Sequence, residues 1–200
     1  MTERPLKVLA VVGSLNRTSS TRQVVQHVAQ QLRALGCEVD VLDLLDEPLA
    51  LFNPDSAHAV SGFQALKTRV EQADVYLLGT PDYHGSISSA LKNFLDHFWH
   101  EFAGKLIATI VASHEKGLTV TDQLRTVARQ CYAWSMPYGV SFADALDVKD
   151  GEIVSEGFRK RLEMLAHDIR RYGQLLARQR QADLTGSDPG FLARWRNIQR

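Results

Sequence analysis

Hydroxyl side chains gather directly after the first apolar run of the chain. The run at residues 6–12 ends at Gly13, and residues 14–21 then contain five serine or threonine residues and one arginine. If the run is a buried strand followed by a helix, this loop lies at a helix N-terminus, where free backbone N–H groups and the helix dipole attract an anion. The composition therefore indicates a phosphate site, although taken alone it also fits an ordinary serine-rich helix cap.

The first loop lacks the usual signatures of dinucleotide and triphosphate sites. It contains no GxGxxG, which allows close approach to a pyrophosphate, and no GK[ST], which supplies a phosphate-binding lysine and a magnesium ligand. Hydroxyls and an arginine suit a terminal phosphate monoester better than a pyrophosphate.

Two later loops are suited to a flat ring. Residues 80–86 (TPDYHGS) combine the planar side chains of Tyr83 and His84 with Gly85, which lets the backbone approach a ligand closely. A proline in the same segment is expected to end the preceding strand. Residues 112–117 (ASHEKG) are again mostly small and polar and end in glycine. A phosphate site together with two loops of this kind predicts FMN as the ligand.

Alternating strand and helix patterns provide the frame that positions these loops. Apolar runs separated by stretches of helical spacing predict βαβ units. With right-handed crossovers these units form a three-layer α/β sandwich, in which a five-stranded parallel sheet carries helices on both faces. Ligands of such sheets bind beyond the carboxyl ends of the strands, so the three loops are expected to meet there. The expected strands are 6–12, 37–44, 73–79, 105–112 and 138–142, and the expected helices are 24–35, 64–72, 88–102, 120–131 and 155–180.

Size and composition favour one domain. The chain has 200 residues, of which 44% are hydrophobic and 23% charged, enough for one complete core. We expect one domain over residues 1–180 and a tail over 181–200 that packs on the body or on a partner subunit.

Charge and hydropathy exclude several classes of partner. Lysine plus arginine equals aspartate plus glutamate at 23 each, so no basic field is present to bind nucleic acid or an anionic membrane surface. No apolar stretch reaches the roughly 20 residues needed to span a bilayer. The sequence therefore predicts a cytoplasmic protein that acts on small molecules.

Three segments resemble a known family. GSLNRTSST, TPDYHGSISSALKNFLDHF and DQLRTVARQCYAWSMPYGVSF are similar to the NAD(P)H-dependent FMN reductases of the flavodoxin-like superfamily. The resemblance covers about residues 6–175. It implies a flavodoxin-like fold, FMN as cofactor, NADPH or NADH as co-substrate, and hydride transfer from the nicotinamide to FMN bound at the strand ends. We favour NADPH, and Arg17, Arg22 or Lys116 could bind its 2′-phosphate.

The resemblance also implies where FMN binds. The residues expected at the phosphate are Ser14, Asn16, Arg17, Ser19, Ser20 and Thr21. The residues expected along the isoalloxazine are Pro81, Asp82, Tyr83, His84, Gly85 and Ser86. The residues expected at its pyrimidine side are Ser113, His114, Glu115 and Gly117. Because the flavin carries the hydride chemistry, neither a catalytic side chain nor a metal is expected.

The electron acceptor and the assembly state stay open at this point. Reduced FMN could leave for a separate flavin-dependent monooxygenase, or stay tightly bound and reduce a quinone, azo dye, chromate or ferric chelate. The family implies a homodimer or a dimer of dimers, a homotetramer. Its contact is formed by the helix 88–102, and the aromatic residues Phe94, Phe98, Trp99 and Phe102 are consistent with that contact.

Two other classes of protein compete with the enzyme. A flavodoxin-type electron carrier shares the fold and the cofactor, but such carriers are typically acidic and this chain is charge-balanced. A non-flavin module that binds a sugar phosphate or nucleotide would need only the first loop.

Overall fold

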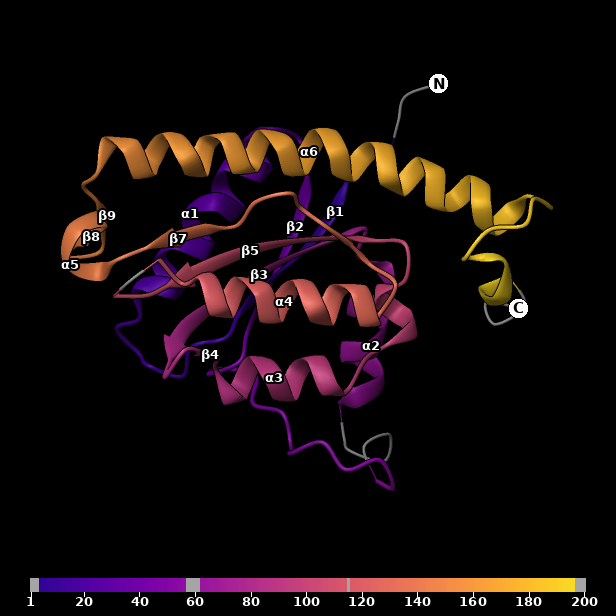
Figure 1. The fold of residues 1–200 in the computed structure, drawn as a ribbon, viewed down its shortest axis with the longest axis horizontal. Coiled ribbons are helices and arrows are strands. Elements are labelled where there is room, and N and C mark those ends of the chain that lie inside the picture. The colour runs from indigo at the N-terminus through magenta and orange to yellow at the C-terminus, as the bar shows by residue number, and fades with distance from the viewer. Residues whose placement is uncertain (1–3, 57–61, 115, 197–200) are drawn as a thin grey trace.

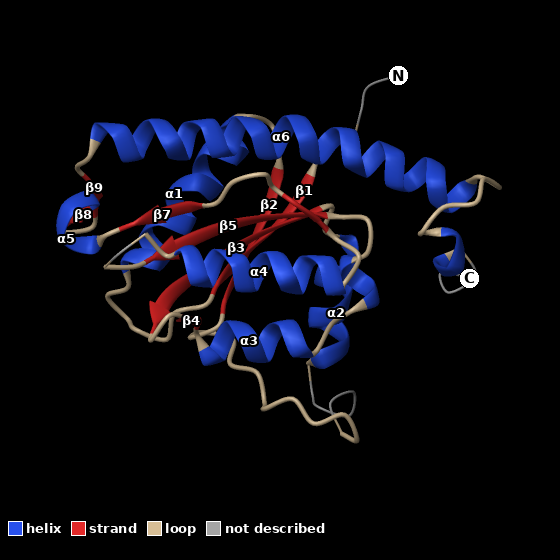
Figure 2. Cartoon of the chain, viewed as in Figure 1, coloured by secondary structure: helices blue, strands red, loops and turns tan. Residues whose placement is uncertain are grey.

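The computed structural model describes residues 4–56, 62–114 and 116–196. A mostly parallel sheet lies between two layers of helices (Figures 1 and 2). Its four long strands are β1 (Lys7–Val12), β2 (Glu38–Asp43), β3 (Val75–Tyr83) and β5 (Leu106–Ala112), in the spatial order β2-β1-β3-β5. The central strands are near-continuous apolar runs because both faces of the sheet are covered.

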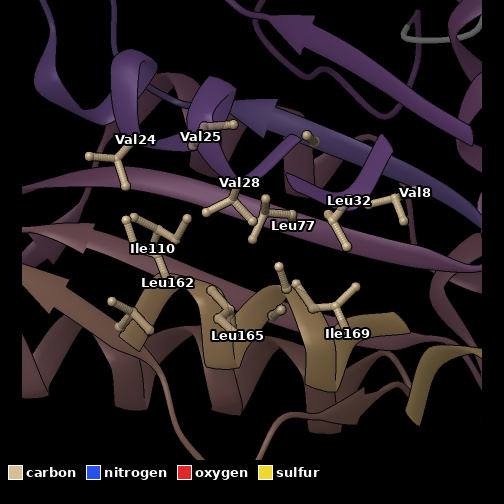
Figure 3. Close-up of a cluster of buried hydrophobic side chains, with 14 of the residues drawn as sticks. Val8, Val24, Val25, Val28, Leu32, Leu77, Ile110, Leu162, Leu165 and Ile169 are labelled. Atoms are coloured by element: carbon tan, nitrogen blue, oxygen red, sulfur yellow. The ribbon is translucent and has the colours of Figure 1, made fainter. Parts of the chain in front are cut away.

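Helices cover the two faces of the sheet unequally. On one face α1 (Ser20–Ala34) and α6 (Glu156–Thr185) pack against the strands, and Figure 3 shows their interlocking aliphatic side chains. On the other face lie α2 (Phe63–Gln72), α3 (Ser89–Asp96) and α4 (Leu118–Gln130). Within the described ranges, none of the helices is both long and apolar enough to cross a bilayer.

The fifth position of the sheet is filled by two short strands where one was predicted. β6 (Trp134–Ser135) pairs with the start of β5, and β7 (Val140–Phe142) pairs with its end. Pro137 lies between them, and its missing N–H cannot contribute to a continuous ladder. The prediction of one strand over 138–142 is therefore wrong in detail, while the parallel direction is confirmed.

Strand β3 continues through Pro81, contrary to the prediction that it ends at residue 79. β1 pairs with β3 only as far as Gly79, whereas β5 pairs with it up to Pro81. Beyond Gly79 one side of β3 therefore needs no amide donor, and a proline is tolerated there. After Tyr83 the chain turns back into β4 (Ser86–Ile87), which pairs antiparallel with β3.

The C-terminal segment folds back onto the body. Helix α6 extends to Thr185, past the predicted end at residue 180. The short 3₁₀ helix η3 (Ala193–Trp195) follows, and Leu192 and Trp195 are buried against Ala103. The indole Nε1 of Trp195 donates to Nδ1 of His100 at 2.9 Å.

The aromatic cluster expected at a subunit contact is largely internal. Phe94, Phe98 and Phe102 belong to the core between the sheet and its second helical layer, and each is at most 4% exposed. Only Trp99 remains about half exposed, at 49%. Three of the four rings therefore stabilise the monomer, because α3, the short 3₁₀ helix η2 (His100–Phe102) and the turn between them place them in this core.

A buried lysine lies at the end of the sheet opposite the three loops. The Nζ of Lys105 donates to the carbonyl oxygens of Val70 and Glu71, at the end of α2, and to the hydroxyl of Tyr76. Burial lowers the pKa of Lys105 to about 7, below the value of about 10.4 in an unfolded chain. Between these two values the unfolded chain holds a proton that the folded chain releases, so this group makes the free energy of unfolding rise with pH.

We expect K105M to remove this pH dependence. The free energy of unfolding of wild type minus that of K105M should rise by up to about 1.4 kcal/mol per pH unit between about pH 7 and 10, because only wild type carries Lys105. Urea unfolding at several pH values measures it. Curves for the two proteins that stay parallel over this range would contradict the expectation.

Candidate functional site

The three predicted loops meet in one cavity of about 190 Å³ at the carboxyl ends of β1, β3 and β5. Parallel strands place the loops that follow them on the same side, as the strand-end rule expects. Its lining residues are Ser14, Asn16, Thr18, Ser19, Ser20, Thr21, Pro81, Asp82, Tyr83, Ala112, Ser113, His114 and Asp144.

The first loop is folded by its own polar side chains. The Oδ1 of Asn16 accepts hydrogen bonds from the backbone N–H and the hydroxyl of Thr18, and Ser19 caps helix α1 by accepting from the N–H of Arg22. Within the described residues, the amides of Ser20 and Thr21 have no protein acceptor, as expected in the first turn of a helix. Hydroxyls and free amides therefore coincide at one wall of the cavity.

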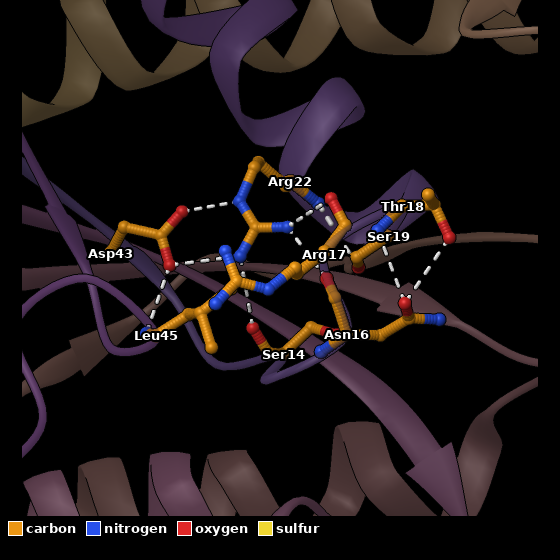
Figure 4. Close-up of polar contacts among 8 residues, drawn as sticks. All are labelled: Ser14, Asn16, Arg17, Thr18, Ser19, Arg22, Asp43 and Leu45. Carbon is orange, nitrogen blue, oxygen red and sulfur yellow. Dashed lines mark hydrogen bonds and ion pairs between the residues drawn. The ribbon is translucent and has the colours of Figure 1, made fainter.

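Arg22 joins the backbone of this loop to the end of β2 (Figure 4). Its guanidinium forms a bidentate pair with Asp43 at the end of β2. The same group donates to the carbonyl oxygens of Ser14, Asn16 and Arg17 at 3.3, 2.6 and 3.1 Å. The hydrogen bond to Asp43 raises the pKa of Arg22. Arg22 is thus engaged in internal contacts, and the suggestion that it binds an NADPH 2′-phosphate stays a prediction that these contacts do not support.

Gly13 joins the first loop to strand β3 and to the start of helix α3. Its N–H donates to the carbonyl of Gly79 at 2.8 Å, and its own carbonyl accepts from the hydroxyl of Ser88, the N-cap of α3, at 2.5 Å. A Cβ at residue 13 would lie 2.7 Å from the oxygen of Gly79 and 2.8 Å from the Cβ of Leu91. The close approach that sets the relative positions of β1, β3 and α3 therefore requires glycine.

The second loop is a tight hairpin between β3 and β4. Its two turn residues, His84 and Gly85, have φ of 57° and 74°, the left-handed pair that matches the twist of a two-residue hairpin. Tyr83 is 53% exposed at the mouth of the cavity. On α4, Gln123 supports the hairpin by accepting from the hydroxyl of Ser86 and from the following amide, and by donating to the carbonyl of Gly85.

Asp82 ties the second loop to the third. One carboxylate oxygen accepts from the N–H of Gly85 at 2.8 Å, and the other accepts from the hydroxyl of Ser113 at 2.9 Å. The amide of Ser113 donates to the carbonyl of Phe142, so the third loop is also attached to β7. Gly117 ends this loop in a left-handed conformation, with φ of 59°, and begins α4.

Some predicted site residues lie outside the cavity lining. Arg17 is exposed and does not line the cavity, and Gly117 belongs to the start of α4. His84, Gly85 and Ser86 form the hairpin turn, one step away from the lining. Glu115 lies outside the described residues.

Other residues were missed. Thr18 and Ala112 lie inside segments that the sequence had already singled out, so adjacency was a usable signal. Asp144 and Gln123 had no such signal, because they reach the site from later elements through tertiary packing.

Comparison with known proteins decides the family. A profile of the NADPH-dependent FMN reductases matches residues 6–147. The chain belongs to this family. It is 30% identical over 168 residues to an NADPH azoreductase of Bacillus sp. (strain OY1-2), covering 82% of this chain and 88% of that protein. It is 28% identical to an FMN-dependent NADPH-azoreductase of Staphylococcus saprophyticus, covering 82% and 93%.

Solved structures of other flavoproteins share the fold. FerB, an NAD(P)H:(acceptor) oxidoreductase from Paracoccus denitrificans, superposes with a TM-score of 0.71 at 20% identity, over 85% of this chain and 98% of that one. An NADH:FMN oxidoreductase, EMOB, superposes with a TM-score of 0.68 at 18% identity, over 84% and 89%. The predicted flavodoxin-like fold, enzyme class, FMN cofactor and NADPH donor are therefore confirmed for this FMN reductase.

The residues at the cavity fit FMN. Free amides at the start of α1 and the hydroxyls of Ser14, Ser19 and Ser20 suit a phosphate. The second and third loops add the half-exposed ring of Tyr83 and the small side chain of Ala112, which suit a flat heterocycle. Polar groups from the first loop together with flat or small ones from the other two match a ring that carries a phosphate tail.

Proposed function

We propose that this FMN reductase binds FMN in the cavity at the strand ends and transfers the electrons of NADPH to a small aromatic acceptor. The convergence of the three loops on one cavity carries this proposal. Bound FMN supplies the hydride-accepting and electron-donating chemistry. The protein supplies binding, orientation and electrostatics.

The first loop is assigned to the phosphate. Ser14, Asn16, Ser19, Ser20 and Thr21 line this end of the cavity, and hydroxyls and N–H groups there would donate to phosphate oxygens. The exposed Arg17 would approach the same phosphate from the solvent side.

The second and third loops are assigned to the ring. Pro81, Asp82 and Tyr83 of the second loop and Ser113 and His114 of the third line the cavity. The hydrogen bond between Asp82 and Ser113 holds these two loops together. His84, Gly85, Ser86 and Gly117 act by holding the two loops in shape, and Glu115 stays a proposed contact without a structural description.

The acceptor is assigned by class. Relatives that match over most of this chain are named azoreductases, and the half-exposed Tyr83 offers an aromatic face beside the cavity on which a flat acceptor could stack. We therefore propose an azo compound or a quinone as acceptor. Delivery of reduced FMN to a flavin-dependent monooxygenase is the alternative.

Anaerobic spectroscopy tests the proposed function. The protein reconstituted with FMN is expected to lose its visible flavin bands when NADPH is added under argon, and to regain them when an azo dye such as methyl red is added while the dye bleaches. NADH at the same concentration is the matched control for donor preference. FMN that binds but is not reduced would mark an electron carrier, and a protein that takes up no FMN would mark a different phosphate-binding module.

Assembly and location are further parts of the proposal. We propose a homodimer or a dimer of dimers in the cytoplasm, in which residues 1–180 form the reductase domain and residues 181–200 its tail. Trp99 and Trp134, both 49% exposed, leave apolar surface near α3 and the tail that supports a subunit contact. Light scattering of wild type and of a W99K/W134K variant tests it, since a monomeric wild type would contradict the proposal.

A further inference from the structure

Asp144 brings a negative charge to the phosphate end of the cavity. It begins the short helix α5 (Asp144–Asp147), directly after β7, and it lines the same cavity as the first loop. Its Oδ1 accepts a hydrogen bond from the hydroxyl of Ser20 at 2.5 Å. In this arrangement, one of the hydroxyls best placed for a phosphate donates to a carboxylate of the protein.

The position of Asp144 is built into the fold. The carboxylate of Asp147 accepts from the amide of Ala143 at 2.9 Å, and the amide of Asp147 donates back to the carbonyl of Ala143. The hairpin formed by β8 (Val148–Lys149) and β9 (Glu152–Ile153) follows at once. Asp144 is therefore held against the start of α1 by a closed turn.

The described residues that line the cavity supply no full positive charge to pair with this carboxylate. Among the described lining residues there is no lysine or arginine, whereas Asp82 and Asp144 are both acidic and His114 is exposed at the rim. Arg22 lies behind the loop but is paired with Asp43. Arg17 in the first loop and Lys116 in the third are close in the chain to lining residues, and both are exposed to solvent.

We propose that Asp144 is a specificity-determining residue that weakens the binding of the FMN phosphate. It acts by repelling the phosphate charge and by competing for the hydroxyl of Ser20. The consequence is that FMN binds less tightly, and exchanges with solution more readily, than it would without this carboxylate. This inference rests on the proposed FMN site.

Comparing FMN with riboflavin isolates the effect, because the two ligands share the ring and differ in the phosphate. Apo-protein is titrated with each ligand, and quenching of flavin fluorescence gives the dissociation constant. D144N keeps an oxygen that can accept from Ser20 but removes the charge, and D144A removes both. D150N is the matched control, since Asp150 is exposed in the β8–β9 turn with φ of 50°, a conformation that asparagine tolerates.

D144N is expected to bind FMN about five- to tenfold more tightly than wild type, as repulsion between charges a few ångströms apart in a solvated site predicts. Riboflavin affinity should stay within about twofold, D144A should shift in the same direction as D144N, and D150N should match wild type. Raising the salt concentration from about 0.02 M to about 0.5 M should narrow the gap between wild type and D144N, because exposed charges are screened.

The outcomes separate this inference from the proposed function. If wild type binds neither FMN nor riboflavin, the proposed FMN site fails. If wild type binds FMN and neither D144N nor D144A binds it more tightly, or if FMN and riboflavin affinities change together, only the role of Asp144 is overturned. Melting temperatures of the variants close to that of wild type confirm that the comparison is made on folded protein.

Discussion

Replacing Arg22 by alanine is expected to lower the free energy of unfolding by about 3 kcal/mol and the affinity for FMN by about a hundredfold. The side chains of Arg22 and Asp43 are only 13% and 12% exposed, so the variant leaves a largely buried carboxylate without its partner. It also removes the hydrogen bonds from Arg22 to the carbonyl oxygens of Ser14, Asn16 and Arg17. These bonds fix the shape of the first loop. Urea unfolding and FMN titration measure the two effects.

Arg69 provides the matched control for R22A. Like Arg22 it forms ion pairs, in this case with the carboxylates of Asp40 and Glu47. These pairs are on the surface, away from the cavity. R69A is therefore expected to cost about 1 kcal/mol or less and to leave FMN affinity unchanged. R22K should recover part of the stability but little of the affinity, since a lysine cannot reproduce the bidentate pair and the three carbonyl contacts together. R22A that binds FMN like wild type would contradict the assigned role of Arg22.

Gly13→Ala is expected to be the most damaging single-methyl change at the site, with a loss of about 2–4 kcal/mol in the free energy of unfolding. The added Cβ would lie 2.7 Å from the carbonyl oxygen of Gly79 and 2.8 Å from the Cβ of Leu91. Neither atom is the end of a flexible side chain, so β1, β3 or α3 must shift. A shift here changes the distance between the first loop and the other two loops of the cavity, and FMN binding should fall along with stability.

Gly157→Ala is the control for added volume. Gly157 lies in the first turn of α6, and a Cβ there meets no atom within 4 Å. G157A is expected to be neutral or to stabilise by up to about 1 kcal/mol, because alanine favours the helix. Thermal unfolding of both variants makes the comparison. A G13A protein as stable as G157A would show that the junction of β1, β3 and α3 tolerates movement.

Much of the architecture could be predicted from local patterns. Buried parallel strands are apolar runs whose ends are marked by glycine and polar residues, so the runs at 6–12, 73–79 and 105–112 located β1, β3 and β5 to within a few residues. Topology rules then placed the loops after them at one edge, and the cavity lies there. The hydroxyl-rich first loop and the ring-binding character of residues 80–86 could be predicted because the residues that suggest this chemistry are consecutive in the chain.

The errors occurred where the outcome depended on a neighbour in space. Pro81 stays within β3 because β1 has already ended beside it, and the end of one strand relative to another is not encoded in either segment alone. Phe94, Phe98 and Phe102 form part of the core, although an amphipathic helix pattern fits a subunit contact equally well.

The sequence by itself determined the family, the parallel α/β fold and the three loops that meet at the cavity, because each depends on short-range patterns and on the direction of parallel strands. Only the tertiary structure decided which partners the charged side chains have. Arg22 is neutralised by Asp43, and Asp144 reaches Ser20 across a separation of 124 residues. The sign and strength of an electrostatic interaction depend on distance and burial, and those quantities exist only once the chain has folded.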